Sequence, residues 1–443
     1  MSKPKIKFHK TIKDFADQVF DLWENFVAGD YTPPPIPNKK QLKYLFEVAY
    51  LASMETEESR FINFTLCCAE KNSEVKRCSS DEILQSWSFE KNREYNIQEI
   101  RRLSVATDPN TTAILIEYDN KVNEIPEIRG LLHLGSSWST ARNAFSYFYE
   151  PLPKTITIRC ISPGYINVYQ GEYAIAKYQS GKCEVGSQSY TTLDLLGAYP
   201  IFREGQDNIR KEIITPTHEN FKDWYEFEGI AYVNVILAIV NKMRIGRHGG
   251  ALILCGLNSN LLEQQLVNIK YQISKPKNHL KNSFIDFMNL RHKHVDRLMY
   301  LEQNIINIKK DKELSLTSFE LLNAEKKLAE DCMFIGNLSG SDGALILKND
   351  LKFEGFGAEI LLDKSQGSKV YKVDRPASDN YSELESEQFG MRHRSAIRLC
   401  SNSSDAVIFV VSQDGGTSLV WNEKGKVYFK TDIKTTNINM ILS

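Results

Sequence analysis

Three stretches near the C-terminus decide how this chain folds: SDGALILKND (Ser341–Asp350), FGMRHRSAIRLC (Phe389–Cys400) and AVIFVVSQDGGTSLVWNEKGKVYFK (Ala406–Lys430). The first and third contain short apolar runs bounded by glycine and aspartate, which is typical of buried strands. The second opens a short helical pattern with a cluster of cations. Strands and helices that alternate in this way predict an α/β (α+β) fold in which a central mixed β-sheet is flanked by helices.

The length and composition limit the classes of protein to consider. The chain has 443 residues, enough for two or three domains, and its net charge is −1. We therefore expect neither nucleic acid nor a membrane as a partner. No apolar run reaches the ~20 residues of a membrane span, and the basic N-terminus lacks the apolar core of a secretory signal. We expect a cytoplasmic protein whose eight cysteines, without a C-x-x-C pair, are free thiols.

The N-terminal part predicts a separate α+β domain. Apolar residues at helical spacing over Phe15–Tyr31 and Lys40–Met54 precede strand-like runs, of which Thr155–Val185 predicts three strands with alternating faces. A polar stretch that contains Pro216 then indicates a junction. The predicted boundaries are residues 1–210 for the N-terminal domain, 211–227 for a linker, 228–432 for the C-terminal domain and 433–443 for a tail.

The C-terminal domain begins with a helix that leads into a buried strand, within Ala231–Gly256. A long amphipathic helix over Ser283–Lys310 follows. Thr317-x-x-Glu320 is a capping-box pattern, which predicts that the next helix opens at Ser318.

Asp342, Gly343 and Ala344 open the strand that follows Ser341. Two very small residues beside a carboxylate leave room for a ligand against the backbone, and carboxylate oxygens suit Mg²⁺ or Mn²⁺. An ordinary Asx turn before a strand has the same pattern. The tripeptide alone therefore does not decide between a metal site and a turn.

A cluster of cations opens the short helical pattern that follows Gly390. It consists of Arg392, His393 and Arg394. Cations at a helix N-terminus oppose the macrodipole. Their placement favours a bound anion, because guanidinium groups and the backbone N–H groups of a first turn both suit phosphate. The alternative is three solvated surface cations, and the apolar residues that follow favour an anchored segment instead.

The hexapeptide SQDGGT (Ser412–Thr417) follows the wholly apolar run Ala406–Val411. α/β proteins bind ligands beyond the carboxyl ends of core strands, and this turn offers hydroxyls, a carboxylate and two glycines there. A tight turn between two strands would also use Gly415 and Gly416, so both interpretations stay open.

With these residues in hand, the C-terminal half resembles the diadenylate cyclase (DAC) domain family. These enzymes condense two ATP into cyclic di-AMP and release two pyrophosphates. The family's hallmarks are Asp-Gly-Ala and then Arg-His-Arg, which here are Asp342–Ala344 and Arg392–Arg394. The resemblance covers about residues 228–430 and includes GALI at Gly250–Ile253. Relative to the minimal domain, residues 275–311 look like an inserted helical hairpin.

The N-terminal domain resembles sensor-like modules found ahead of some DAC domains. ASMETEESRF (Ala52–Phe61) and SPGYINV (Ser162–Val168) carry this likeness. It implies a regulatory domain, whose ligand the sequence does not name.

The resemblance implies a role for each motif. Asp342 would bind Mg²⁺ or Mn²⁺ and help to activate the ribose 3′-hydroxyl, and Asp414 would be a second metal ligand. Arg392, His393 and Arg394 would hold phosphates and complete the catalytic set. Each copy would bind one ATP, so the reaction requires a homodimer or higher homo-oligomer whose sites face each other. The implied ATP-binding residues are Gly343, Ala344, Gly390, Met391, Ser395, Ser412, Gly416 and Thr417.

Three positions depart from the family pattern. Ser341 replaces a histidine, Met391 replaces a threonine, and Gln413–Gly415 replaces Glu-Glu-Thr. These changes leave an alternative function, a catalytically weak or inactive sensor that binds ATP or cyclic di-AMP. A further alternative is an interaction protein that works through its N-terminal domain.

Overall fold

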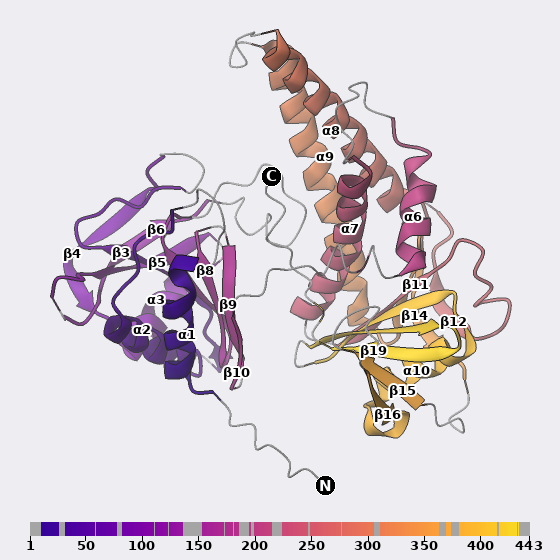
Figure 1. Ribbon diagram of the computed structural model, residues 1–443, viewed down its shortest axis with the longest axis horizontal. Helices are drawn as coiled ribbons and strands as arrows, with labels where there is room; N and C mark the ends of the chain where they lie inside the picture. The colour runs from indigo at the N-terminus through magenta and orange to yellow at the C-terminus, as the bar shows by residue number, and fades with distance from the viewer. Residues whose placement is uncertain are drawn as a thin grey trace. The chain divides into compact units, whose positions relative to one another are not determined.

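The structure is a computed structural model that describes residues 10–25, 32–57, 59–77, 82–109, 111–122, 124–135, 153–171, 173–179, 181–185, 195, 199–214, 224–246, 249–275, 277–304, 311–362, 369–373, 381–413, 416–431 and 433. These residues form two compact units (Figure 1). The first holds the described residues up to Val185, and the second holds those from Leu195 onward. Each unit has its own mixed sheet with helices packed against it, which confirms the predicted α/β class.

The N-terminal unit is built on an eight-stranded sheet of order β10-β9-β8-β7-β3-β5-β6-β4. Only β3 and β5 pair in parallel, and the other neighbours are antiparallel. The short strands β1 (Thr56–Glu57) and β2 (Arg60–Phe61) form a separate hairpin. The strands of the large sheet are β3 (Phe64–Glu70), β4 (Ser86–Glu94), β5 (Thr112–Tyr118), β6 (Glu127–His133), β7 (Ile156–Ser162), β8 (Tyr165–Gln170), β9 (Tyr173–Gln179) and β10 (Lys182–Val185).

The prediction of three strands over Thr155–Val185 was wrong by one. This stretch forms four strands, β7 to β10. Gly181 has φ +82, a conformation that glycine adopts without steric cost, and the chain turns back there from β9 into β10.

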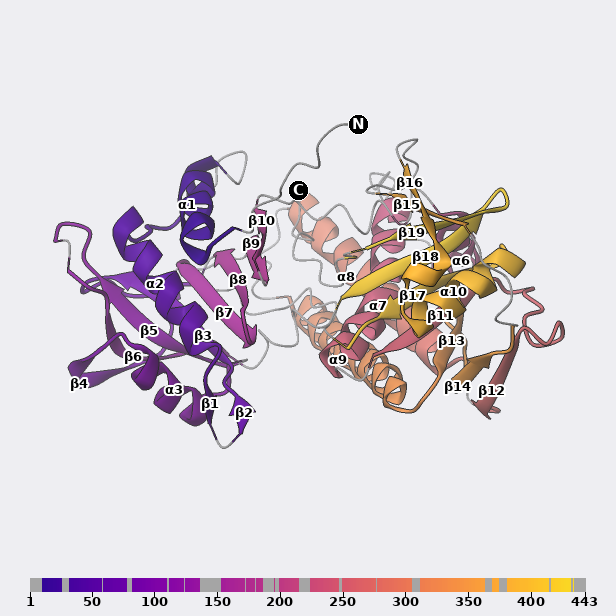
Figure 2. The same cartoon turned by 90° about the horizontal axis from the view of Figure 1, so that it is seen from below.

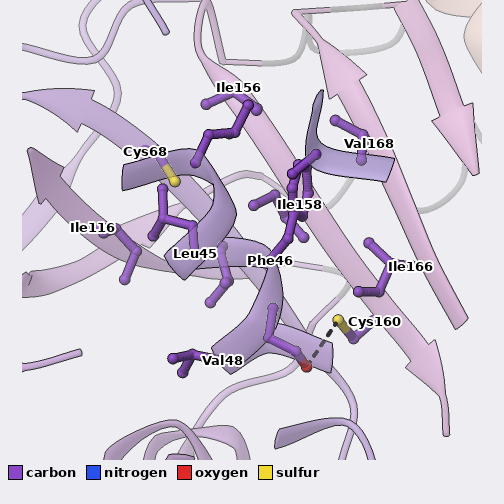
Figure 3. Close-up of a cluster of buried hydrophobic side chains, with 14 of the residues drawn as sticks. Leu45, Phe46, Val48, Cys68, Ile116, Ile156, Ile158, Cys160, Ile166 and Val168 are labelled. Atoms are coloured by element: carbon purple, nitrogen blue, oxygen red, sulfur yellow. Dashed lines mark hydrogen bonds between the residues drawn. The ribbon is translucent and has the colours of Figure 1, made fainter. Parts of the chain in front are cut away.

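Helices α1 (Ile12–Leu22), α2 (Lys39–Ala52) and α3 (Ile97–Ala106) supply the other layer of this unit. Leu45 and Phe46 of α2 pack in the buried cluster that also contains Ile158 of β7 and Val168 of β8 (Figure 3). The predicted helices at Phe15 and Lys40 are thereby confirmed, although α1 ends at Leu22 and is followed by the 3₁₀ turn η1 (Trp23–Asn25).

The C-terminal unit is built on a nine-stranded sheet of order β12-β14-β13-β11-β17-β18-β19-β15-β16. The pairs β11–β13 and β19–β15 are parallel, and the other pairs are antiparallel. The strands are β11 (Gly250–Cys255), β12 (Val267–Gln272), β13 (Ala344–Lys348), β14 (Phe353–Ile360), β15 (Lys369–Val373), β16 (Tyr381–Glu385), β17 (Ala406–Val411), β18 (Thr417–Glu423) and β19 (Lys426–Lys430).

Helices cover both faces of this sheet (Figure 2). α10 (Met391–Asn402), which follows the 3₁₀ turn η4 (Ser386–Gln388), packs on one face, where its Ile397 and Leu399 join a cluster with Ile408 and Val420. On the other face lie α6 (Pro200–Arg210) and α7 (Trp224–Gly246), of which α7 contacts β17. α9 (Lys312–Asn337) packs along α7 and leads through η3 (Leu338–Gly340) into β13.

The predicted boundary at residue 210 was wrong, because α6 belongs to the second unit. The ring of Phe202 lies 6.4 Å from that of Phe409 in β17, and the ring of Tyr199 lies 4.8 Å from that of Trp421 in β18. α6 is amphipathic, with Phe202, Gln206 and Ile209 buried and Asp207 exposed. The first described part of the predicted linker, residues 211–214, likewise stays with this unit.

α8 (His279–Gln303) and α9 form the long antiparallel hairpin seen in Figure 1. The predicted inserted hairpin, residues 275–311, therefore contains only the first of the two helices, α8. α9 begins at Lys312, and its N-cap is Asp311, whose carboxylate accepts a hydrogen bond from Leu314 N–H at 2.7 Å. The predicted capping box at Thr317 was therefore wrong: its hydroxyl donates to the carbonyl of Leu314 inside the helix.

One described helix, α7, is long and apolar enough to span a membrane, over Phe227–Gly246. Within the unit, 67% of its most apolar window is buried. Asn234 and Asn241 interrupt its apolar residues, which is why no continuous run of that length is found in the sequence.

Candidate functional site

The three motifs meet where one set of ends of the central strands of the C-terminal sheet lies. We call this row of strand ends the motif edge. The parallel strands β11 and β13 both begin there, with Ala251 paired to Ala344. β17 runs the other way and ends there, with Val411 paired to Gly250 and to Thr417, the first residue of β18. With neighbouring strands about 4.8 Å apart, these four strand ends span about 14 Å. The motif edge therefore gathers Asp-Gly-Ala and SQDGGT from distant parts of the chain.

Asp342 stands exposed at the motif edge, and Gly343 behind it is packed against β14. Gly343 has φ +115, and a Cβ there would lie only 2.5 Å from the carbonyl carbon of Gly357. Gly357 itself has φ +66. The space that a side chain on Gly343 would occupy is thus filled by the backbone of β14, which fixes the course of the chain beside the Asp342 carboxylate.

α10 points its N-terminus at the motif edge. Its N-cap, Gly390, makes no side-chain cap hydrogen bond, and its first turn contains no acidic residue. A Cβ on Gly390 would meet no heavy atom of the described residues within 4 Å, so this point at the helix N-terminus is open among them. The first turn of a helix carries N–H groups without partners inside the helix, together with a partial positive charge. An anion in this space would be stabilised by both.

The guanidinium of Arg392 reaches the start of β11. Its Nη1 lies 2.8 Å from the point that a Cβ on Gly249 would occupy, and the carbonyl oxygen of Val411 lies 3.2 Å from the same point. Gly249 has φ +66, a conformation that favours glycine. Arg392 thereby connects α10 to the ends of β11 and β17.

His393 ties the first turn of α10 to the sheet. Its Nε2 lies 3.3 Å from Oγ of Ser418 in β18, and its ring lies 5.6 Å from that of Phe429 in β19. Phe389 packs on the same ring at 6.2 Å. The half-buried imidazole thus anchors the first turn of α10 on β18 and β19.

Two polar atoms near the motif edge are buried without a hydrogen-bond partner among the described residues. They are Nε of Arg394 and Oγ1 of Thr417, whose side chain is only 3% exposed. A buried polar atom left unpaired costs about 1–3 kcal/mol. A ligand or water that satisfies these atoms would recover this cost.

The remaining predicted residues also lie at the motif edge where the structure describes them. Ser412 N–H donates to the carbonyl of Gly416 at 2.8 Å, which closes the turn between β17 and β18. Met391 is 76% exposed at the first position of α10, and Ser395 is half-buried one turn later. Asp414, the second predicted metal ligand, lies outside the described residues.

The described residues contain no group of three or more His, Cys, Asp or Glu side chains that could hold a metal ion. Asp342 is their one carboxylate in the three motifs. Mg²⁺ commonly takes one or two protein carboxylates and completes its octahedron with water and phosphate oxygens. A single exposed carboxylate therefore fits Mg²⁺ or Mn²⁺ bound together with a polyphosphate, and does not fit a metal held by protein alone.

Two contributors to the site were not identified from the sequence. They are Gly249 and Gly357. Each matters through a residue far away in the chain, Arg392 in one case and Gly343 in the other. Gly249 directly precedes β11 and Gly357 lies inside β14, and neither position carries a local signal of these contacts.

A family model described as probable sensor domain DACNV matches residues 31–133, from just before α2 to the end of β6. This confirms the predicted sensor-like module: the chain carries a sensor domain of the kind found ahead of diadenylate cyclases. The chain matches no curated protein. A crystal structure of the hypothetical membrane spanning protein from Bacillus cereus matches with 17% identity and a TM-score of 0.25, over 54% of this chain and 91% of that one. At this TM-score the match carries no information about the fold.

Proposed function

We propose that the protein is a metal-dependent diadenylate cyclase that condenses two ATP into cyclic di-AMP and two pyrophosphates. The observation that carries the proposal is the motif edge, where Asp342 and the cationic N-terminus of α10 stand at the ends of neighbouring strands. The DACNV match in the N-terminal unit supports the same function, since that sensor domain accompanies diadenylate cyclases.

In each half of the reaction, the ribose 3′-oxygen of one ATP forms a bond to the α-phosphorus of the other. The bond from that phosphorus to the β-phosphate bridging oxygen breaks, and pyrophosphate leaves. Asp342 accepts or orients the 3′-hydroxyl proton. Arg392, Arg394 and the first turn of α10 hold phosphate oxygens, so catalysis consists mainly of positioning and charge neutralisation.

Mg²⁺ or Mn²⁺, when bound, would neutralise phosphate charge at this site. Asp342 would hold it together with the substrate's phosphates, and Asp414 is the proposed second ligand. Because each copy binds one ATP, two copies must face each other to close the ring. A homodimer or higher oligomer is therefore part of the proposal. We also propose the cytoplasm as its location, where ATP is available.

A product assay tests the proposal. The full-length protein is incubated with ATP and Mg²⁺ or Mn²⁺, and cyclic di-AMP is measured by liquid chromatography and mass spectrometry. Asp342→Asn keeps the size of the side chain and removes its charge, so we expect loss of product by at least about 100-fold, in the range found for proton-transfer groups. The matched control is Asp405→Asn, an exposed aspartate just before β17, at the opposite end of that strand. This variant should retain wild-type activity.

A second candidate is a nucleotide-binding sensor without turnover. Gln413, exposed after β17, carries an amide where the family has a carboxylate. This candidate predicts that calorimetry detects binding of ATP or cyclic di-AMP, while no cyclic product forms with either metal over the range of concentrations that saturates binding.

A further inference from the structure

An exposed aromatic pair on β12 and β14 has no part in the motifs. Tyr271 of β12 and Phe356 of β14 are partners in the strand register. Their ring centroids are 4.7 Å apart with an interplanar angle of 21°, so the rings are stacked. Tyr271 is 45% exposed although its ring is in contact with another. The pair therefore presents aromatic surface to solvent.

The two glycines that hold the Asp342 backbone also connect the pair to the site. Gly357 follows Phe356 directly, and a Cβ on Gly357 would lie 3.1 Å from Cδ2 of Tyr271 and 3.4 Å from the carbonyl oxygen of Asp342. The edge of the tyrosine ring and the backbone of Asp342 are thus both within 3.4 Å of one point. Gly357 therefore lies between the tyrosine ring and the backbone of the proposed metal-binding residue.

The pair faces the side of the sheet on which α10 packs. Ile269 and Ala358, two residues further along the same strands, are register partners and belong to the cluster beneath α10. Side chains two residues apart in a strand share a face, so Tyr271 and Phe356 continue that apolar surface past the buried core. In the register, Ala344 at the motif edge pairs with Ala358, so Phe356 lies about two residues further into the sheet. The aromatic pair therefore shares the α10 face and lies inward from the motif edge.

Resting on the proposed function, we propose that Tyr271, backed by Phe356, is the stacking surface for the purine base of the bound nucleotide. The phosphates would lie at α10 and Asp342, and the base would extend over the tyrosine ring. Every nucleobase has a π face, so stacking contributes affinity without choosing between adenine and guanine. Lys270 Nζ lies 5.1 Å from the ring centroid, and an exposed contact of this kind is weak enough for a base to displace.

A different role for the pair is purely structural. Stacked cross-strand aromatics stabilise the pairing of an edge strand such as β12. The two roles predict different effects of a Tyr271 substitution on the affinity for a ligand that has no base. Stacking affects only ligands that carry a base, whereas loss of strand pairing disturbs the whole site and the stability of the unit.

The test compares ATP with inorganic tripolyphosphate, each with Mg²⁺, by isothermal calorimetry on the full-length chain. Tyr271→Leu should raise the Kd for ATP about tenfold, the order of magnitude of one base–aromatic stack. It should leave the Kd for tripolyphosphate unchanged, and Tyr271→Phe should retain ATP affinity. Tyr381→Leu is the matched control: Tyr381 is also exposed and also in an aromatic pair, but in the opposite edge strand β16.

Each result distinguishes the two proposals. Equal ATP affinity in wild type and Tyr271→Leu overturns the stacking surface and leaves the cyclase proposal intact. Parallel loss of both probes, with a lower melting temperature, also overturns it in favour of the structural role. Tight ATP binding that depends on Tyr271, without any cyclic product, supports the stacking surface and overturns the cyclase proposal. If wild type binds neither probe, both proposals are overturned.

Discussion

Replacement of Gly343 by alanine tests the close packing that sets up the motif edge. The new methyl would lie 2.5 Å from the carbonyl carbon and 2.7 Å from the Cα of Gly357. These are backbone atoms of β14, so they cannot rotate away as the end of a side chain can. The backbone at φ +115 costs about 1–3 kcal/mol for a residue with a Cβ. Forcing the strands apart costs about 1–3 kcal/mol more.

The expected loss is therefore about 2–6 kcal/mol in the free energy of unfolding, measured by urea denaturation and by scanning calorimetry of the full-length chain. For a unit of this size, each kcal/mol lowers the melting temperature by about 2–4 °C. Gly256→Ala is the control, because a Cβ there meets no heavy atom within 4 Å, and it should change stability by less than about 0.5 kcal/mol. Equal stability of the two variants would refute the contact between Gly343 and Gly357.

Three further predictions concern buried polar groups. Thr417→Val removes a buried hydroxyl that has no hydrogen-bond partner among the described residues, so it should stabilise the ligand-free protein by about 1 kcal/mol in urea and weaken ATP binding in calorimetry. No effect on binding would exclude this hydroxyl from the site. Lys281→Met removes a buried cation 3.3 Å from the 1% exposed Asp350, so it should cost up to about 3 kcal/mol, whereas Lys326→Met at an exposed pair should cost almost nothing. Burial holds the pKa of His292 below its ordinary 6.5, so the folded state binds fewer protons than the unfolded state and stability should fall as the pH drops below 6.5. His292→Asn should make this pH dependence of the urea midpoint shallower, and an unchanged slope would contradict the assignment.

Local patterns in the sequence were sufficient to predict the strands that carry the motifs. The apolar runs that became β11, β13 and β17 are short, wholly apolar and bounded by glycine or polar residues, so their type was unambiguous. The Asp-Gly-Ala and Arg-His-Arg triplets indicated which strand and helix ends to examine. The order of the strands, which brings these ends together, depends on pairing between distant segments and has no local signal.

The errors have a common physical origin. α6 was assigned to the wrong unit because its few apolar residues, such as Phe202, pack on a strand about 200 residues later. The capping box at Thr317 was a valid local pattern, but Asp311 offered an earlier cap that also pairs with Arg297 of α8 at 2.6 Å. In both cases tertiary contacts decided between local alternatives. The sequence does not indicate a role for Tyr271 for the same reason, because Gly357, which lies close to its ring, belongs to another strand.

The stoichiometry of the products tests the central claim most directly. Full-length protein is given ATP as the only nucleotide, with Mg²⁺ or Mn²⁺, and cyclic di-AMP and pyrophosphate are both quantified over time. A diadenylate cyclase releases two pyrophosphates for each cyclic di-AMP, and neither should accumulate with Asp342→Asn. ATP binding without cyclic di-AMP, or cyclic di-AMP formed equally by Asp342→Asn, would contradict the proposal that the motif edge is a cyclase site.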